Sequence, residues 1–284
     1  MTLRRAIIRA LDRPGGRFLL SKMATRYARS RTNADIAIYF DEIWTHRVGT
    51  HTFPDSLAFD YYADAVVSWT RQLAEYYRDA ADYWFHVYKP KAGDVIVDVG
   101  AGHGEDTLPF STAVGPTGRV LAVEAHPTSF LILRRFCELN GLVNVKPLHY
   151  AIVDRPSTVY IDTREKWETN AVRFDAGDRS TTPVQAVTVD DLCEAEQLTT
   201  IDFLKINIEG AETLALRGLQ RLVSRVEHLA VACHDFRAER GDGEEFRTRA
   251  AVIEILREMG FALALRDDDP RPYVRDHVHA FRSR

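Results

Sequence analysis

Short apolar runs alternate with amphipathic segments over the C-terminal two thirds of this 284-residue chain. Uninterrupted apolar runs are typical of strands buried on both faces, and apolar residues at every third or fourth position are typical of helices. The runs predict strands at Asp94–Val99, Arg119–Glu124, Val143–Leu148, Ile201–Ile206 and His228–Cys233. The amphipathic segments predict helices at Glu105–Val114, Thr128–Asn140, Gly210–Ser224 and Glu244–Met259. We therefore expect an α/β fold, with a parallel sheet covered by helices on both faces.

Two more strands are predicted at the end of the chain, at Phe261–Arg266 and His277–Phe281. Only a short polar turn joins them, and a connection that short links antiparallel neighbours. The last strand should therefore run against the others in a mostly parallel, seven-stranded sheet. This arrangement resembles the Rossmann-like fold of class I methyltransferases.

The chain has two segments outside that pattern. Residues 1–90 combine helical apolar spacing, at Leu3, Ile7, Ile8 and Leu11 and again from Ala63 to Tyr88, with many aromatic residues. They predict a helical N-terminal extension that contacts substrate or a second subunit, ahead of a catalytic domain at 91–284. Within that domain, residues 155–189 form a predicted insert. It holds two β segments, Ser157–Asp162 and Val184–Val189, around a polar loop, Thr163–Pro183.

Charge is distributed unevenly along the chain. The net charge is −4, which gives no general attraction to nucleic acid, so we expect no nucleic-acid partner. Residues 1–31 nevertheless contain nine Lys and Arg residues and one Asp, a net charge of +8, which leaves −12 for the rest. Two interpretations stay open for this basic segment. It packs its apolar side on the body or on a second subunit in a homo-oligomer, or it makes a peripheral contact with an anionic membrane.

The cysteines favour a reducing compartment. Cys137, Cys193 and Cys233 are odd in number and scattered, so they form neither a disulfide framework nor a Cys-x-x-Cys metal site. No apolar run approaches the length of a membrane span, and no signal-peptide core is present at the N-terminus. We expect a cytoplasmic protein.

A glycine-rich loop follows the first strand of the predicted sheet, at Gly100-Ala101-Gly102-His103-Gly104. Glycines let the backbone turn sharply and approach a ligand closely. Their spacing is not the G-x-G-x-x-G of a dinucleotide site, so nicotinamide is not the first choice. Asp98 precedes the loop, and Glu124 ends the next strand, where a carboxylate can bind both hydroxyls of a ribose. Two such acids suit a ligand that has an ammonium group and a ribose, and S-adenosylmethionine (SAM) has both.

Each part of SAM has predicted contacts. Asp98 accepts from the ammonium group, and the backbone amides of the loop hold the carboxylate at a helix N-terminus. Ala151 follows the third strand, at the expected adenine edge, and His126 either packs on the adenine or caps the next helix. The predicted cofactor-binding residues are Asp98, Gly100, Ala101, Gly102, Gly104, Thr107, Glu124, Ala125, His126, Ala151 and Asn207.

Polar residues also follow the fourth and fifth strands. The carboxyl ends of neighbouring parallel strands meet at the edge of the sheet where α/β proteins bind ligands. Asn207, Glu209 and His234 are the predicted catalytic residues, with His234 as the base that takes a proton from an acceptor hydroxyl. As an alternative, Glu209, His234 and Asp235, with Asn207, ligate a divalent metal ion. In a purely structural interpretation, Asn207 caps a helix and Glu209 is an acid in its first turn.

Four sequence elements together resemble the FkbM family of methyltransferases, over roughly residues 90–235. They are Val97–Gly104, Val123–Pro127, Leu-Lys-Ile-Asn-Ile-Glu-Gly-Ala-Glu at 204–212, and Leu216–Leu219. The resemblance implies a SAM-dependent O-methyltransferase acting on a hydroxyl of a small molecule, sugar or lipid-linked acceptor, with its reaction centre near Glu209. Two positions depart from the family pattern. Asn207 replaces the usual Asp, which weakens a base or metal role there, and Ala125-His126 replaces Pro-Asn.

Three other functions stay open at this point. An RNA methyltransferase shares the fold, and a nicotinamide oxidoreductase uses a similar glycine-rich loop. A non-enzymatic, membrane-associated scaffold would use the basic segment at residues 1–31.

Overall fold

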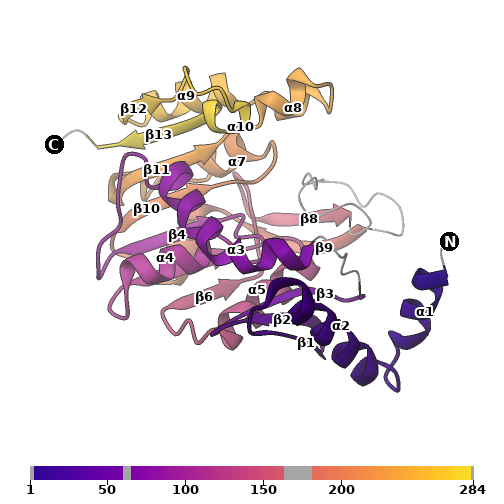
Figure 1. Ribbon diagram of the computed structural model, residues 1–284. Helices are drawn as coiled ribbons and strands as arrows, with labels where there is room; N and C mark the ends of the chain where they lie inside the picture. Colours follow the sequence, from indigo (N-terminus) through magenta and orange to yellow (C-terminus); the bar gives the residue numbers. More distant parts are fainter. Residues whose placement is uncertain (1–2, 60–64, 163–180, 283–284) are drawn as a thin grey trace.

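The computed structural model describes residues 3–59, 65–162 and 181–282. Its centre is a seven-stranded sheet in the order β12-β13-β11-β10-β4-β5-β6 (Figure 1). The strands are β4 (Val95–Val99), β5 (Arg119–Val123), β6 (Val145–Leu148), β10 (Ile201–Ile206), β11 (Val226–Ala232), β12 (Ala262–Leu265) and β13 (His277–Phe281). Each strand begins and ends within two residues of its predicted bounds.

The directions of the strands also agree with the prediction. From β6 through β5, β4 and β10 to β11, every neighbouring pair is parallel. The last strand, β13, lies between β11 and β12 and is antiparallel to both. A parallel sheet with this reversed strand confirms the predicted class I methyltransferase fold.

Helices cover both faces of the sheet, because alternate strand residues point to opposite sides. On one face, residues such as Val97 and Leu204 pack against α6 (Val189–Ala195), α7 (Glu212–Arg217) and α9 (Arg249–Glu258). On the other face, residues such as Ile96 and Phe203 pack against α4 (Thr107–Val114) and a π-helical turn, η1 (Ala80–Trp84). There, Ala122 packs against α5 (Pro127–Leu139). The strands are apolar without alternation because both of their faces are buried.

The predicted helices of the domain are present but shorter at several ends. The helix expected at Gly210–Ser224 is only α7, since Gly210 takes a φ of +92° and keeps the preceding turn out of the helix. The helix expected at Glu244–Met259 is divided into a 3₁₀ turn, η4 (Glu244–Phe246), and α9. Three short helices, α6, α8 (Asp235–Glu239) and α10 (Pro272–Arg275), are additions to the prediction.

The N-terminal extension is not helical throughout, which corrects the prediction. Three helices are present, α1 (Leu3–Leu11), α2 (Arg17–Thr32) and α3 (Ala65–Asp79). Between α2 and α3, β1 (Ile36–Asp41), β2 (Ile43–Val48) and β3 (His51–Ser56) form an antiparallel sheet. The turns between these strands contain Glu42 and Gly49 at positive φ. No helix in the described ranges is long and apolar enough to cross a membrane.

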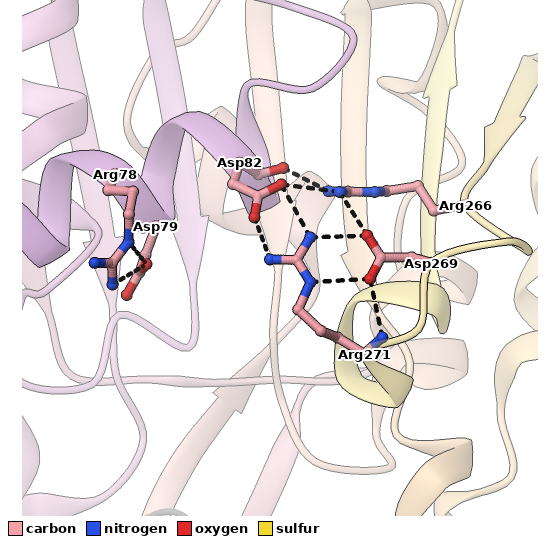
Figure 2. A network of polar contacts seen from close by, with 6 residues as sticks. All are labelled: Arg78, Asp79, Asp82, Arg266, Asp269 and Arg271. Atoms are coloured by element: carbon pink, nitrogen blue, oxygen red, sulfur yellow. Dashed lines mark hydrogen bonds and ion pairs between the residues drawn. The ribbon is translucent and has the colours of Figure 1, made fainter.

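Two of the contacts between the extension and the domain lie at opposite edges of the sheet. Next to α5, the side chain of Asn140 donates to the carbonyl of Thr52 (2.7 Å) and accepts from its amide (3.0 Å). At the opposite edge of the sheet, Asp82 of η1 accepts hydrogen bonds from Arg266 (2.8 Å) and Arg271, which both also bind Asp269 (Figure 2). These contacts fix η1 against the end of the sheet that holds β12.

The insert forms a small sheet of its own, in the order β7-β9-β8. It comprises β7 (Ala151–Ile152), β8 (Ser157–Asp162) and β9 (Thr181–Val187). The prediction for β8 is confirmed at both ends, whereas β9 begins three residues before the predicted Val184 and is followed by α6. Residues 163–180 of the predicted polar loop lie outside the described residues.

Candidate active site

A pocket opens where β4, β5 and β10 end, on the side predicted for ligand binding. Its lining residues are Val99, Gly100, Gly102, Val123, Glu124, Ala125, His126, Tyr150, Ala151, Ile152, Ile161, Asn207, Ile208 and Glu209. Seven predicted cofactor-binding residues are among them, namely Gly100, Gly102, Glu124, Ala125, His126, Ala151 and Asn207. The structure thus brings together residues that are more than a hundred positions apart in the sequence. Tyr150 and Ile161, which the sequence did not single out, complete the wall.

The glycine loop approaches the neighbouring strands so closely that a side chain at its first position would not fit. Gly100 has a φ of +79°, and a Cβ atom there would lie 1.9 Å from the carbonyl oxygen of Asn207. The backbone amides of Gly100 and Ala101 both donate to the carbonyl of Val123, at 2.9 and 3.0 Å. The loop is therefore held between β5 and β10, with its backbone exposed to the pocket.

A buried lysine supports this loop from beneath. Lys205 of β10 donates from Nζ to the carbonyl of Gly100 (2.7 Å) and forms ion pairs with Asp98 (2.9 Å) and Asp106 (3.4 Å). Burial lowers the pKa of the Lys205 ammonium, but the two carboxylates outweigh it and raise that pKa above its usual value. No role was predicted for Lys205, although a lysine between Leu204 and Ile206 of a buried strand was a signal.

Four predicted cofactor-binding residues lie behind the pocket wall. Asp98 is fully buried, and it binds Lys205 with one oxygen while the other accepts from the hydroxyl of Thr107 (2.8 Å). Ala101 is buried in the core, and a Cβ atom on Gly104 would lie 2.6 Å from the ring of Phe136. These four residues stabilise the shape of the glycine loop, whereas Gly100 and Gly102 line the pocket. Direct contacts of Asp98, Ala101, Gly104 and Thr107 with a cofactor stay predictions.

Glu124 and His126 form the polar side of the pocket. The Glu124 carboxylate accepts from the amides of Gly102 (2.9 Å) and His126 (2.7 Å), and burial raises its pKa to about 7. His126 caps α5, which confirms one of its two predicted roles, and it also lines the pocket. Packing of its ring on the adenine stays a prediction. The Nδ1 of His126 accepts from the amide of Ser129 (3.3 Å), which places the hydrogen of the neutral ring on Nε2. That nitrogen is buried and has no hydrogen-bond partner among the residues that the structure describes.

Glu209 lines the pocket where β10 ends, and three other charged residues lie around it. We call Glu209, Glu212, His234 and Arg237 the reaction-centre cluster. His234 is bound on both sides, to Glu212 through Nδ1 (2.7 Å) and to Glu209 through Nε2 (3.2 Å). Arg237 binds the second oxygen of Glu209. Glu212 and Arg237 were not predicted as site residues, because nothing in the sequence places α7 and α8 against each other.

The backbone at Glu209 is strained, with a φ of +41° that non-glycine residues seldom adopt. The fully buried Glu212 contributes to holding this turn, since its Oε1 accepts from the amide of Gly210 (3.0 Å) as well as from His234. Such strain persists only where surrounding contacts fix it, and it is concentrated at functional sites. The turn carries the Glu209 side chain to the wall of the pocket, while His234 stays behind it.

The cluster changes the proton affinity of its members. Burial lowers the pKa of His234, but the carboxylates of Glu209 and Glu212 outweigh it and raise that pKa to about 9. For Glu209 burial acts in the opposite sense, and His234 and Arg237 bring its pKa below the usual value. At neutral pH, therefore, His234 is an imidazolium between two carboxylates. A base at His234 stays a prediction, and it would first have to lose this proton.

The metal alternative does not form as predicted. Asp235 points away from Glu209 and His234, because its carboxylate accepts from the amides of Thr248 (3.0 Å) and Arg249 (2.9 Å) at the start of α9. Within the described ranges, no group of three His, Cys, Asp or Glu residues is arranged to hold a metal ion. Asn207 is not a helix cap either, since the residue before α7 is Ala211.

Comparison with known proteins places this arrangement in a family. The family model described as "Methyltransferase FkbM domain" matches residues 98–263, more than half of the chain. The chain belongs to the FkbM methyltransferase family. The match confirms the resemblance in the four sequence elements, and it includes the glycine loop, Glu124 and the whole reaction-centre cluster. None of the curated proteins matches this sequence.

Solved structures of methyltransferases are similar to this FkbM-family chain. Methyltransferase FkbM from Methylobacillus flagellatus is 17% identical, with a TM-score of 0.49 over 79% of this chain and 55% of that one. This chain thus spans about half the length of that relative. Fibrillarin from Aeropyrum pernix, solved with bound SAM, is 17% identical, with a TM-score of 0.41 and coverage of 73% and 75%. A SAM-dependent methyltransferase from Aquifex aeolicus is 16% identical, with a TM-score of 0.42 and coverage of 74% and 96%.

Proposed function

We propose that this chain transfers a methyl group from SAM to a hydroxyl of a small molecule, sugar or lipid-linked acceptor. The observation that carries the proposal is a pocket lined by the glycine loop, by the buried acid Glu124 and by the strained Glu209. Membership in the FkbM family supports methyl transfer, and the pocket supports SAM as the methyl donor.

The pocket fits the donor in four respects. The glycine loop lines the pocket at Gly100 and Gly102, and Glu124 has no cation partner among the described residues and can accept from two ribose hydroxyls. The buried Nε2–H of His126 needs an acceptor, which a ribose or adenine supplies. Ala151 and Ile152 provide an apolar wall for the base. When bound, SAM supplies an activated methyl group on a sulfonium, so most of the catalysis is alignment.

Glu209 is the proposed proton acceptor. An acceptor oxygen becomes strongly acidic as it bonds to the methyl group, so even a carboxylate with a lowered pKa can take its proton. His234 and Arg237 each bind one oxygen of Glu209 and fix its direction toward the pocket. In this arrangement His234 is a positioning residue. It would act as the base itself only above the pKa of about 9 at which it loses its proton.

We also propose that the protein functions in the cytoplasm. Cys137, Cys193 and Cys233 are free and buried, as expected where thiols stay reduced. The residues that select the acceptor are proposed to lie in the insert and the N-terminal extension. Ile161 of the insert already forms part of the pocket wall.

Isothermal titration calorimetry with the Glu124→Ala variant tests the donor assignment. Wild-type protein should bind SAM and its demethylated product. Glu124→Ala should bind both about 10- to 100-fold more weakly, because it loses charge-assisted hydrogen bonds to the ribose. Glu138→Ala, which removes an exposed acid from α5, is the control and should bind normally.

Two results would contradict the proposal. One is binding of NADH without binding of SAM, which would favour an oxidoreductase. The other is unchanged SAM affinity in Glu124→Ala when circular dichroism shows that the variant is folded. Transfer of labelled methyl groups from SAM into a metabolite extract would then identify the acceptor class.

A further inference from the structure

The N-terminal helices expose more large apolar side chains than any other part of the described chain. Eleven large hydrophobic residues are exposed in the described ranges, and five of them lie between positions 7 and 27. These five are Ile7, Phe18, Leu19, Met23 and Tyr27, with Phe18 70% exposed. The other six are at least ten residues apart from one another in the sequence. Scattered exposed apolar residues need no explanation, but a contiguous group indicates a surface that contacts something.

Four of the five lie on the exposed half of α2. Leu19, Met23 and Tyr27 are four residues apart and form one stripe along the helix, and Phe18 lies on the adjoining side with Lys22, while Leu20 and Ala28 point into the core of the extension. Lys22 and Arg26 lie on the exposed face as well. The α2 face, as we call Phe18, Leu19, Lys22, Met23, Arg26 and Tyr27, therefore combines apolar and cationic side chains.

A groove of about 840 Å³ adjoins this face, between α2 and β1. Four of its lining residues are cations, Arg17, Lys22, Arg26 and Arg29, and none is an acid. Arg17 is bound by Asp12 (3.0 Å) and Arg29 by Asp35 (3.5 Å). Lys22 and Arg26 have no carboxylate partner among the described residues, and Lys22 instead lies over the ring of Phe18 (4.2 Å). The groove thus keeps two uncompensated positive charges beside exposed apolar side chains.

We propose that the α2 face docks on the surface of an anionic lipid bilayer. Lys22 and Arg26 would bind lipid phosphates at the groove, while Phe18, Leu19 and Met23 enter the boundary between headgroups and acyl chains. The proposal does not depend on methyl transfer, and its test contains no SAM.

Other occupants fit the same observations less well. A symmetric contact with a second copy would place Lys22 and Arg26 of the two copies against each other. An asymmetric contact would need a second apolar patch, and the described part of the chain shows only single exposed hydrophobics elsewhere. A nucleic acid would satisfy the cations but would leave Leu19 and Met23 without a partner.

Vesicle flotation of the full chain tests the proposal. Wild-type protein should float with vesicles of equal parts phosphatidylcholine and phosphatidylglycerol, should not float with phosphatidylcholine alone, and should be released by high salt. Each cation near anionic lipid contributes about fivefold to affinity, so Lys22→Glu/Arg26→Glu should weaken binding at least about 25-fold. Phe18→Ser/Leu19→Ser/Met23→Ser should also abolish flotation.

The control is Lys89→Glu/Arg257→Glu, which makes the same change in net charge at two exposed cations outside the α2 face and should float like wild type. The charge variant alters only exposed side chains, so it decides the test if the apolar variant does not fold. Equal flotation with neutral and anionic vesicles, or none with either, would overturn the proposal. If the wild type does not float, two further measurements identify the real partner. Light scattering that shows a dimer in the wild type but not in the charge variant would indicate a second copy, and salt-sensitive RNA binding would indicate a nucleic acid.

Discussion

Two clusters of four charged residues in this protein have the same alternation of acids and bases but differ in their surroundings. The reaction-centre cluster is largely buried, with Glu212 inaccessible and His234 6% exposed. The second cluster, Asp82, Arg266, Asp269 and Arg271, fixes the extension to the edge of the sheet (Figure 2). Its side chains are 11–37% exposed, and guanidinium groups supply all of its cations.

The two clusters differ in whether every carboxylate oxygen has a hydrogen-bond partner and in whether the backbone is strained. In the Asp82 cluster, Asp82 and Asp269 each bind both arginines, and none of the four residues is at positive φ. In the reaction-centre cluster, one oxygen of Glu212 has no hydrogen-bond partner in the described part of the chain, and Glu209 is at positive φ. Paired charges alone therefore do not mark a site. A strained residue that lines a pocket, held by buried charges behind it, does.

Replacement of His234 should have the largest effect on stability and on turnover. His234→Ala leaves Glu212 as a buried, unpaired carboxylate, so the free energy of unfolding should fall by about 3–5 kcal/mol. Turnover should fall about 100-fold or more, with SAM affinity within about threefold of wild type, because Glu209 loses its orientation. Urea unfolding, calorimetry and methyl transfer to the identified acceptor measure these three quantities.

The matched control is His228→Ala, at a residue that lies on β11 six residues before His234 and is stacked on Tyr88. It should cost about 1 kcal/mol and leave turnover unchanged. A large loss of SAM affinity in His234→Ala, at a temperature where the variant is folded, would contradict the assignment of His234 to the reaction centre.

The pH dependence of stability should be the next largest effect. The pKa of His234 rises from an ordinary value of about 6.5 in the unfolded chain to about 9 in the folded one. Its contribution to stability, about 3 kcal/mol, is therefore complete below pH 6.5 and is lost as the pH rises through about 9. Urea unfolding across this range should show the loss in wild type and not in His234→Gln. An identical pH dependence of the two proteins would show that His234 is not the group responsible.

The pH dependence of turnover separates the two roles of His234. If His234 is the base, turnover rises with pH until the pKa of about 9 is reached, since only the neutral ring accepts a proton. If it orients Glu209, as we propose, turnover does not rise over that range. A rate that increases tenfold for each pH unit up to about 9 would return the role of base to His234.

The smallest effect is expected in the Asp82 cluster. Asp82→Asn should lower the free energy of unfolding by about 1 kcal/mol, because partly exposed ion pairs contribute little and Asp269 still binds both arginines. The loss should shrink at high salt, and turnover should stay normal. A loss as large as that of His234→Ala, or a fall in turnover, would show that the two clusters do not differ in the way we infer.

The fold was predictable because burial on both faces makes the strands apolar with little alternation, as at residues 120–123. The three-stranded sheet of the extension was not predicted. Its alternating pattern is short, and the aromatic residues around Tyr39 and Trp44 suit either a helix or a strand packed on a core. Residues that precede or follow strand ends, such as Glu124 and Asn207, were predictable as pocket residues because parallel strands end at a common edge.

By itself, the sequence determined the parallel sheet, the glycine loop and the acid at the end of the second strand. All three depend on local properties of the sequence. These are the apolar runs, the backbone freedom of glycine, and the place of Glu124 at the end of the strand that follows the glycine loop. Only the tertiary structure decided that Lys205 supports the loop, that Asp235 caps α9, and that Glu212 and Arg237 join Glu209 and His234. Those contacts join side chains from separate elements, and their strength comes from burial, which no single segment of the chain provides.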